Sequence, residues 1–203
     1  MENNKLQIEV SDLDVFVQRF HFIKNEILKS NLAISMQYIA FLVKTEAEFE
    51  TTGAVEYSIF KNIIQYTASV IEGVLHYGLE IALAKGIVEE HRIMPKAESF
   101  PERKLLHQID KLTKIEGVKC VKKHEKFKKN TQFKTVCDAY KKGKLIDNEL
   151  IKNINDLRDK RNKIHLAGLT KVENYYTKND INEAFEVANK VIKEVEEIVL
   201  NKV

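Results

Sequence analysis

Residues 54–85 form the stretch that most limits the folds open to this chain. These 32 consecutive residues contain no proline, are apolar over a wide arc at helical spacing, and are followed by Gly86. The pattern predicts one long, central α-helix, because a helix that is apolar on most sides has to be buried. Gly73 and Gly78 interrupt it and disfavour a helix by roughly 1 kcal/mol each relative to alanine. We therefore expect neighbouring helices to approach closely at these two glycines.

The remainder of the chain continues the helical pattern. With seven Gly and two Pro in 203 residues, it has few positions for the turns of a many-stranded protein. Residues 6–10 alternate and are compatible with a short strand. Further helices are predicted over residues 12–30, 31–50, 101–115, 131–142, 147–166 and 180–201. We expect Asp147 to cap the first of the last two helices, and Asn179 or Asp180 to cap the second.

These elements predict an all-α fold class, an up-and-down helical bundle with short connections. The expected organisation is a single helical domain over 1–203, with an N-terminal helical hairpin at 1–53 and a core at 54–203. The core contains a lysine-rich insert at about 116–144.

Several classes of protein are disfavoured by composition. The chain starts with no basic segment leading into an apolar stretch, and no run of about 18 apolar residues occurs, so we expect no signal peptide and no membrane span. Cys120 and Cys137 are too few for a disulfide framework and lack further ligands at zinc spacing. The expectation is a cytoplasmic protein with free thiols that requires no metal and no cofactor.

Charge is unevenly distributed along the chain. The net charge of +3 does not by itself indicate nucleic-acid binding, but between Lys119 and Lys144 there are ten lysines and two acids. The last predicted helix is acidic instead. The asymmetry favours an anionic partner near the middle of the chain, although a solvated lysine-rich loop explains it equally well.

The helix predicted at 147–166 carries cationic side chains on its apolar face. Measured around the helix from Ile154 at 100° per residue, Arg158, Arg161 and His165 fall at about 40°, −20° and 20°, inside the aliphatic arc, and Asn162 falls at about 80°. A buried guanidinium without a partner costs several kcal/mol, so such groups are paired or line a cleft. The chain has 28 lysines and five arginines, two of them in this helix. Arginine here indicates a need for a planar cation with several donors.

Arginine and histidine on one helix face suit phosphodiester chemistry. Histidine exchanges a proton near neutral pH, and arginine binds a phosphate through two hydrogen bonds. A different interpretation is structural: arginines near a helix C-terminus often pair with carboxylates, and a histidine on an apolar face is more often a hydrogen-bonded core residue.

The segment LRDKRNKIHL, 157–166, resembles the signature of the HEPN superfamily (higher eukaryotes and prokaryotes nucleotide-binding domains). That signature is an arginine, four to six residues, then a histidine, usually with a polar residue after the arginine. Arg158 followed by His165 fits the spacing, with six residues between them. Arg161-Asn162 supplies the favoured dipeptide, but only three residues separate Arg161 from His165. Both arginines stay candidates. The segment 68–80 is similar to an earlier long helix of the family, and Glu72 matches its acidic residue.

The resemblance implies a HEPN-like helical bundle that forms a homodimer with the two motifs across one cleft. Many members are metal-independent endoribonucleases of toxin–antitoxin or phage-defence systems. Arg158 and His165 would then be catalytic, Arg161, Asn162 and Glu72 would contribute to substrate binding, RNA would be the substrate, and an antitoxin protein would be a candidate partner. Other members lack activity, so a non-catalytic nucleotide-binding or dimerisation module is the alternative.

Overall fold

The computed structural model describes residues 8–162 and 176–200, and this part of the chain is mostly helical. The helices and strands are α1 (Leu13–Arg19), α2 (Glu26–Phe49), α3 (Gly53–Ala84), α4 (Glu90–Ile93), β1 (Lys96–Gln108), β2 (Lys114–His124), α5 (Phe133–Gly143), α6 (Asn148–Asn162) and α7 (Lys178–Leu200).

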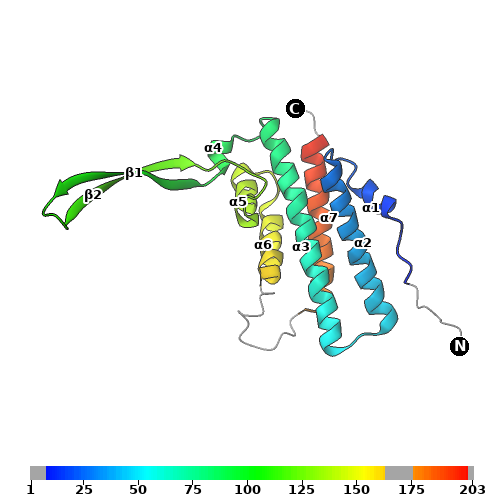
Figure 1. The fold of residues 1–203 in the computed structure, drawn as a ribbon. Helices are drawn as coiled ribbons and strands as arrows, with labels where there is room; N and C mark the ends of the chain where they lie inside the picture. The colour runs from blue at the N-terminus through cyan, green and yellow to red at the C-terminus, as the bar shows by residue number, and fades with distance from the viewer. Residues whose placement is uncertain (1–7, 163–175, 201–203) are drawn as a thin grey trace.

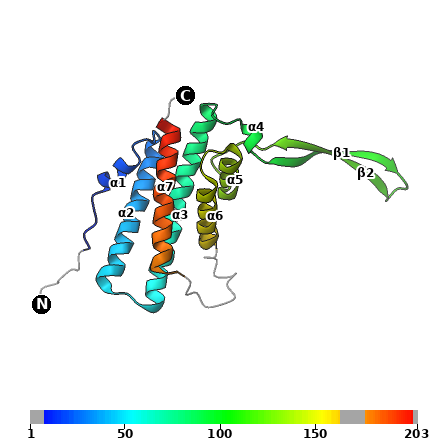
Figure 2. The ribbon, with the colours of Figure 1, turned by 180° about the vertical axis from the view of Figure 1, so that it is seen from behind.

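Helix α3 is the centre of the bundle, as its length and apolar character predict. It packs against α7 and α2, and its second half also contacts α5 and α6 through Glu72, Leu75 and Gly78. Figures 1 and 2 show α5 and α6 on one side of α3, with α2 and then α1 on the other. Buried side chains from α2 to α7 form one continuous apolar core. No helix within residues 8–162 and 176–200 is long and apolar enough to cross a membrane.

Helices α2, α6 and α7 begin at polar residues whose side chains accept hydrogen bonds from N–H groups of the first turn. The side chain of Asn25 accepts a hydrogen bond from the Leu28 N–H at the start of α2. Asp147 accepts one from the Glu149 N–H, so its predicted role as the cap of α6 is confirmed. At the start of α7 the cap is Thr177, which exchanges hydrogen bonds with Asp180 three residues later. The prediction of Asn179 or Asp180 as the cap residue was therefore wrong by two or three positions.

Close approach of helices explains the two glycines inside α3. A side chain at Gly78 would overlap the hydroxyl of Tyr140 on α5 and would lie 2.7 Å from a methyl group of Val195 on α7. At Gly73 the nearest neighbour would be a methyl group of Leu32 on α2, at 3.1 Å. The hydroxyl of Tyr140 is buried and donates a hydrogen bond to the carbonyl of Leu75. The predicted close packing at both glycines is confirmed.

Two of the predicted elements near the N-terminus were wrong. The helix expected over 12–30 ends at Arg19, and the next begins at Glu26, because Phe20, Phe22 and Ile23 turn into the core as a non-helical segment. Asn25 then starts α2 instead of lying within a helix. Residues 8–10 of the strand suggested for 6–10 have no regular secondary structure.

The largest correction concerns residues 96–124, where a helix was expected over 101–115. Strands β1 and β2 pair there as one antiparallel ribbon, so the fold is mainly helical rather than all-α. The ribbon projects away from the helices (Figure 1), and its two ends meet where the Glu125 N–H donates to the Pro95 carbonyl over 2.9 Å. The lysine-rich insert expected at about 116–144 consequently comprises β2, a loop and α5.

Candidate functional site

A pocket of about 570 Å³ opens where α3, α5 and α6 meet. Three of its lining residues come from the end of α6, two from α3, and the rest from the start of α5. They are Gln65, Glu72, Gln132, Phe133, Lys134, Arg158, Arg161 and Asn162. We call it the arginine pocket.

Arg161 and Glu72 form an ion pair within the arginine pocket. The guanidinium Nη1 of Arg161 donates to Oε2 of Glu72 over 2.6 Å, joining α6 to α3 across 89 positions of sequence. Their side chains are 31% and 27% exposed. The pair is therefore partly shielded yet reachable from solvent, so a second anion can approach the same guanidinium.

Arg158 lies deeper, with its side chain 14% exposed. It donates from Nε and Nη2 to Oδ1 of Asp159, over 3.3 and 2.8 Å, and from Nη1 to the side-chain oxygen of Asn155. These partners are neighbours on its own helix, so they fix the side chain without joining it to another element. The guanidinium is thus held in place where it lines the pocket.

The start of α5 adds positive potential to the arginine pocket. Gln132 occupies the cap position of α5 and makes no capping hydrogen bond through its side chain. The first N–H groups of a helix lack partners within the helix and carry the positive end of its dipole. The two arginines face two carboxylates, Glu72 in the pocket and Asp159 beside Arg158. Lys134 and the start of α5 add positive charge to this balance, so the site stays cationic overall. The arrangement favours binding of an anion with several oxygens, such as a phosphate group.

Cys137 and His76 lie near the arginine pocket without lining it. Burial raises the pKa of the Cys137 thiol to about 12, although the charge of Arg158 acts in the opposite direction. The thiol is free and stays protonated, which makes it a packing residue and not a nucleophile. His76 follows Glu72 by one turn of α3; burial lowers its pKa, while Glu72, the Thr131 backbone and Glu80 oppose that shift.

The structure brings together four of the five residues that the sequence singled out. Arg158, Arg161, Asn162 and Glu72 line one pocket, with Asn162 exposed at its rim. His165 lies outside the described residues. That these five residues act in catalysis or binding stays a prediction.

Three polar residues of the arginine pocket were missed. Gln65 stands seven residues before Glu72, so helical periodicity could have placed both on one face of α3. Gln132 and Lys134 carry no such signal, because their position depends on how α5 packs beside α6.

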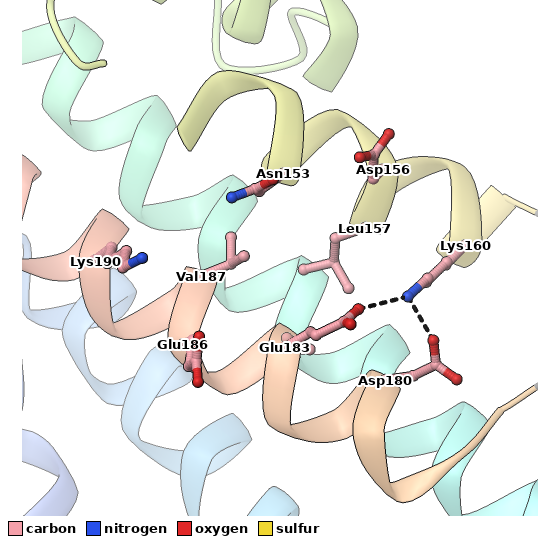
Figure 3. A pocket seen from close by; sticks show the side chains of 10 residues that line it. Asn153, Asp156, Leu157, Lys160, Asp180, Glu183, Glu186, Val187 and Lys190 are labelled. Atoms are coloured by element: carbon pink, nitrogen blue, oxygen red, sulfur yellow. Dashed lines mark hydrogen bonds and ion pairs between the residues drawn. The ribbon is translucent and has the colours of Figure 1, made fainter. Parts of the chain in front are cut away.

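A second pocket, of about 260 Å³, lies on another face of α6, against α7 (Figure 3). Its polar lining is mainly acidic, and Lys160 points across it to Asp180 and Glu183 over 2.5 and 3.2 Å. These contacts raise the pKa of Lys160 although burial acts against them, and Lys160 in turn lowers the pKa of Asp180. Four carboxylates line this pocket against two lysines, and one of these lysines, Lys160, is already paired with two of the carboxylates. The acidic excess does not suit a phosphate.

Comparison with known proteins yields no match: no protein-family model, curated protein or solved structure matches this chain. Membership of the HEPN superfamily therefore stays a prediction based on the motif at 157–166. Within the described residues, no group of three or more His, Cys, Asp or Glu side chains is arranged to hold a metal ion.

Proposed function

We propose that this protein binds RNA through the arginine pocket and cleaves it as a HEPN-type, metal-independent endoribonuclease. The observation that carries the proposal is the convergence of Arg158, Arg161 and Lys134, from two helices, on one open pocket. A phosphodiester offers two charged oxygens to such a site, and charge-assisted hydrogen bonds from arginine are among the strongest that a protein makes.

Each residue of the motif has a distinct role in this proposal. Arg158 holds the scissile phosphate, and Arg161 joins it by exchanging the carboxylate of Glu72 for a phosphate oxygen. Asn162, at the rim, orients the substrate. His165 removes the proton of the ribose 2′-hydroxyl or protonates the leaving oxygen, as a group that titrates near neutral pH can do.

A nuclease assay on the intact protein tests the proposal. Structured RNA is incubated in EDTA with the wild type and with the variants His165→Ala and Arg158→Ala, and His107→Ala in the exposed ribbon serves as the control. We expect cleavage by the wild type and by the control, and its loss in both motif variants. Circular dichroism shows whether each variant is folded. Cleavage that persists in folded His165→Ala contradicts the catalytic role.

The alternative is a non-catalytic HEPN-like module that binds a nucleotide or supports dimerisation. It is favoured by one observation: both arginines already have partners, Arg161 in Glu72 and Arg158 in Asp159 and Asn155. RNA or nucleotide binding by the wild type that depends on the arginines, without cleavage, supports this module. A homodimer, an antitoxin partner and a role in a toxin–antitoxin or phage-defence system stay predictions from the resemblance.

A further inference from the structure

A further pocket, of about 550 Å³, lies next to the arginine pocket at the base of the β-ribbon. It lies between the end of β2 and the start of α5, and Gln132 lines both pockets. Its other lining residues are Pro95, Glu125, Lys126, Lys128, Asn130, Thr131 and Thr135. We call it the lysine pocket.

The lining of the lysine pocket suits a phosphate group. Lys126 and Lys128 supply two ammonium groups against the single carboxylate of Glu125, and Asn130 and Thr131 add an amide and a hydroxyl. Ammonium groups attract phosphates as point charges, and neutral donors position them. The lining is thus cationic overall, like that of the arginine pocket.

The loop that carries these groups is held in a defined conformation. The Lys128 N–H donates to the Thr131 hydroxyl over 2.9 Å, and the Thr131 N–H donates back to the Lys128 carbonyl over 2.9 Å. The Thr131 backbone also lies close enough to His76 of α3 to oppose the lowering of the His76 pKa by burial. The hydrogen bonds between Lys128 and Thr131 fix the backbone of the turn at 128–131, which leads directly into Gln132 and the start of α5.

From this continuity we propose that the two pockets form one track for successive phosphates of a single-stranded polynucleotide. One phosphate binds between Arg158 and Arg161, and a neighbouring phosphate binds between Lys126 and Lys128, with Gln132 between them. The substrate class is therefore a strand of several nucleotides and not a mononucleotide, which fills one pocket at a time. This inference rests on the proposed function, since it assigns the arginine pocket to a phosphate.

Length and salt dependence of binding test the track. Fluorescence anisotropy is measured in EDTA with labelled 2′-O-methyl oligouridylates of three, six and twelve nucleotides, which resist cleavage, and with uridine monophosphate as a competitor. The test variant is Lys126→Gln/Lys128→Gln. The matched control is Lys141→Gln/Lys142→Gln, which removes two exposed lysines from the far end of α5.

The wild type should bind twelve nucleotides much more tightly than three. The test variant should lose roughly tenfold in affinity for the longest strand, and its slope of log affinity against log salt should fall by about 1.4, the value for two lost contacts to a single strand. The inhibition constant of uridine monophosphate at the arginine pocket should be unchanged, and the control should keep the wild-type slope.

Two results would overturn the track. One is an affinity that does not depend on the length of the strand; the other is an equal loss of affinity in the test variant and the control, which would indicate general attraction to the positive charge of the protein. Failure of the proposed function has a different signature. In that case Arg158→Gln/Arg161→Gln leaves binding of both the strand and uridine monophosphate unchanged. Equal affinity for a duplex and a single strand would overturn the assigned substrate class.

Discussion

Glu72 accepts from the guanidinium of Arg161, the group to which the proposed function assigns a phosphate oxygen. Its carboxylate accepts from Arg161 over 2.6 Å, and both side chains are partly exposed. Partly exposed ion pairs contribute about 1 kcal/mol or less. A polyanion that makes two hydrogen bonds to Arg161 can therefore displace the carboxylate. Under the proposed function, we expect Glu72 to lower the affinity for RNA while it keeps the arginine in position.

We expect Glu72→Gln to tighten binding of the 2′-O-methyl strand by about fivefold at low salt, because a competing charge is removed while a hydrogen-bond acceptor remains. Anisotropy titration measures the change. Glu80→Gln, two turns along α3 and exposed, removes the same charge away from the pocket and should have little effect. Weaker binding by a folded Glu72→Gln protein would show that the carboxylate supports the site rather than competing for it.

Gly78 can be tested through stability. Gly78→Ala should lower the free energy of unfolding by about 1–2 kcal/mol, because overlap with Tyr140 and Val195 outweighs the gain in helix propensity. Gly73→Ala is the matched control in the same helix. Its nearest neighbour is the flexible end of Leu32, so we expect a change within about 0.5 kcal/mol. Urea denaturation measures both free energies of unfolding, and equal losses would contradict this account of the close packing at Gly78.

At the level of single residues, helical periodicity predicted on which side of a helix a residue lies, but not which residues of different helices meet. The places of Arg158 and Arg161 on the apolar side of α6 follow from helical geometry, and the resemblance supplied Glu72 as their acidic counterpart. The approach of Lys134 could not be predicted, since it lies on a short helix whose packing angle is set by long-range contacts. Spacing within one helix is a local property, whereas the meeting of three helices is not.

At the level of elements, the ribbon shows where helical periodicity fails. Residues 101–115 contain Leu105, Leu106, Ile109 and Leu112 at spacings that also occur on one face of a helix. In the structure, β1 instead pairs with β2, whose valines and isoleucine favour an extended backbone. A helical wheel considers the spacing of residues within one segment, so it cannot reveal that β1 pairs with β2. Helices α3 and α5 were predicted correctly, as was α6 as far as Asn162, where the described residues end, because each of them buries apolar residues at helical spacing.

The turn of the ribbon depends on Asp110. Its Oδ1 accepts from the N–H groups of Leu112 and Thr113 over 2.7 and 2.8 Å, and these bonds lower the pKa of the carboxyl below its ordinary value of 3.8. Because the folded pKa is lowered, the stabilisation is present above the unfolded pKa and is lost as the pH falls through the folded one.

We expect Asp110→Ala to accelerate amide exchange in the ribbon at pH 6 and to leave the urea midpoint of the bundle unchanged, since the contacts of the ribbon are almost all between its own strands. After correction for intrinsic exchange rates, the difference between variant and wild type should shrink as the pH falls below 3.8. A difference that persists there would show that the carboxylate charge does not hold the turn.

On the scale of the whole molecule, charge is separated between regions. Residues 96–144 carry 15 lysines and arginines and 6 acids, while the chain as a whole has a net charge of +3. The remaining helices are therefore acidic overall. A mainly helical bundle was predictable from the scarcity of glycine and proline, and so was a basic middle region. That the basic region lies beside the arginine pocket depends on chain topology and was not predictable.

Association between two copies of the chain can be examined on the outer face of α2. Ile34 is 52% exposed there, and Tyr38 and Phe41 follow it at helical spacing, with the Tyr38 ring 4.7 Å from that of Tyr66. Contiguous exposed apolar groups of this kind are typical of association surfaces. Because α2 lies on the other side of α3 from α6, a contact through α2 would be a second kind of association and not the one that faces two motifs across a cleft. If α2 forms that contact, Phe41→Lys should convert dimers to monomers in sedimentation velocity, whereas Ala47→Lys elsewhere on α2 should not. A wild-type monomer at every concentration contradicts the homodimer.

Because the ribbon leaves and re-enters the helical body at adjacent points, Pro95 and Glu125, its length is independent of everything else in the fold. Adding or removing one residue from each strand would keep the paired register and move only the tip. Natural variation in chain length should therefore concentrate around residues 105–115, and a peptide epitope inserted between Ile109 and Thr113 would be displayed far from the helices without altering their packing.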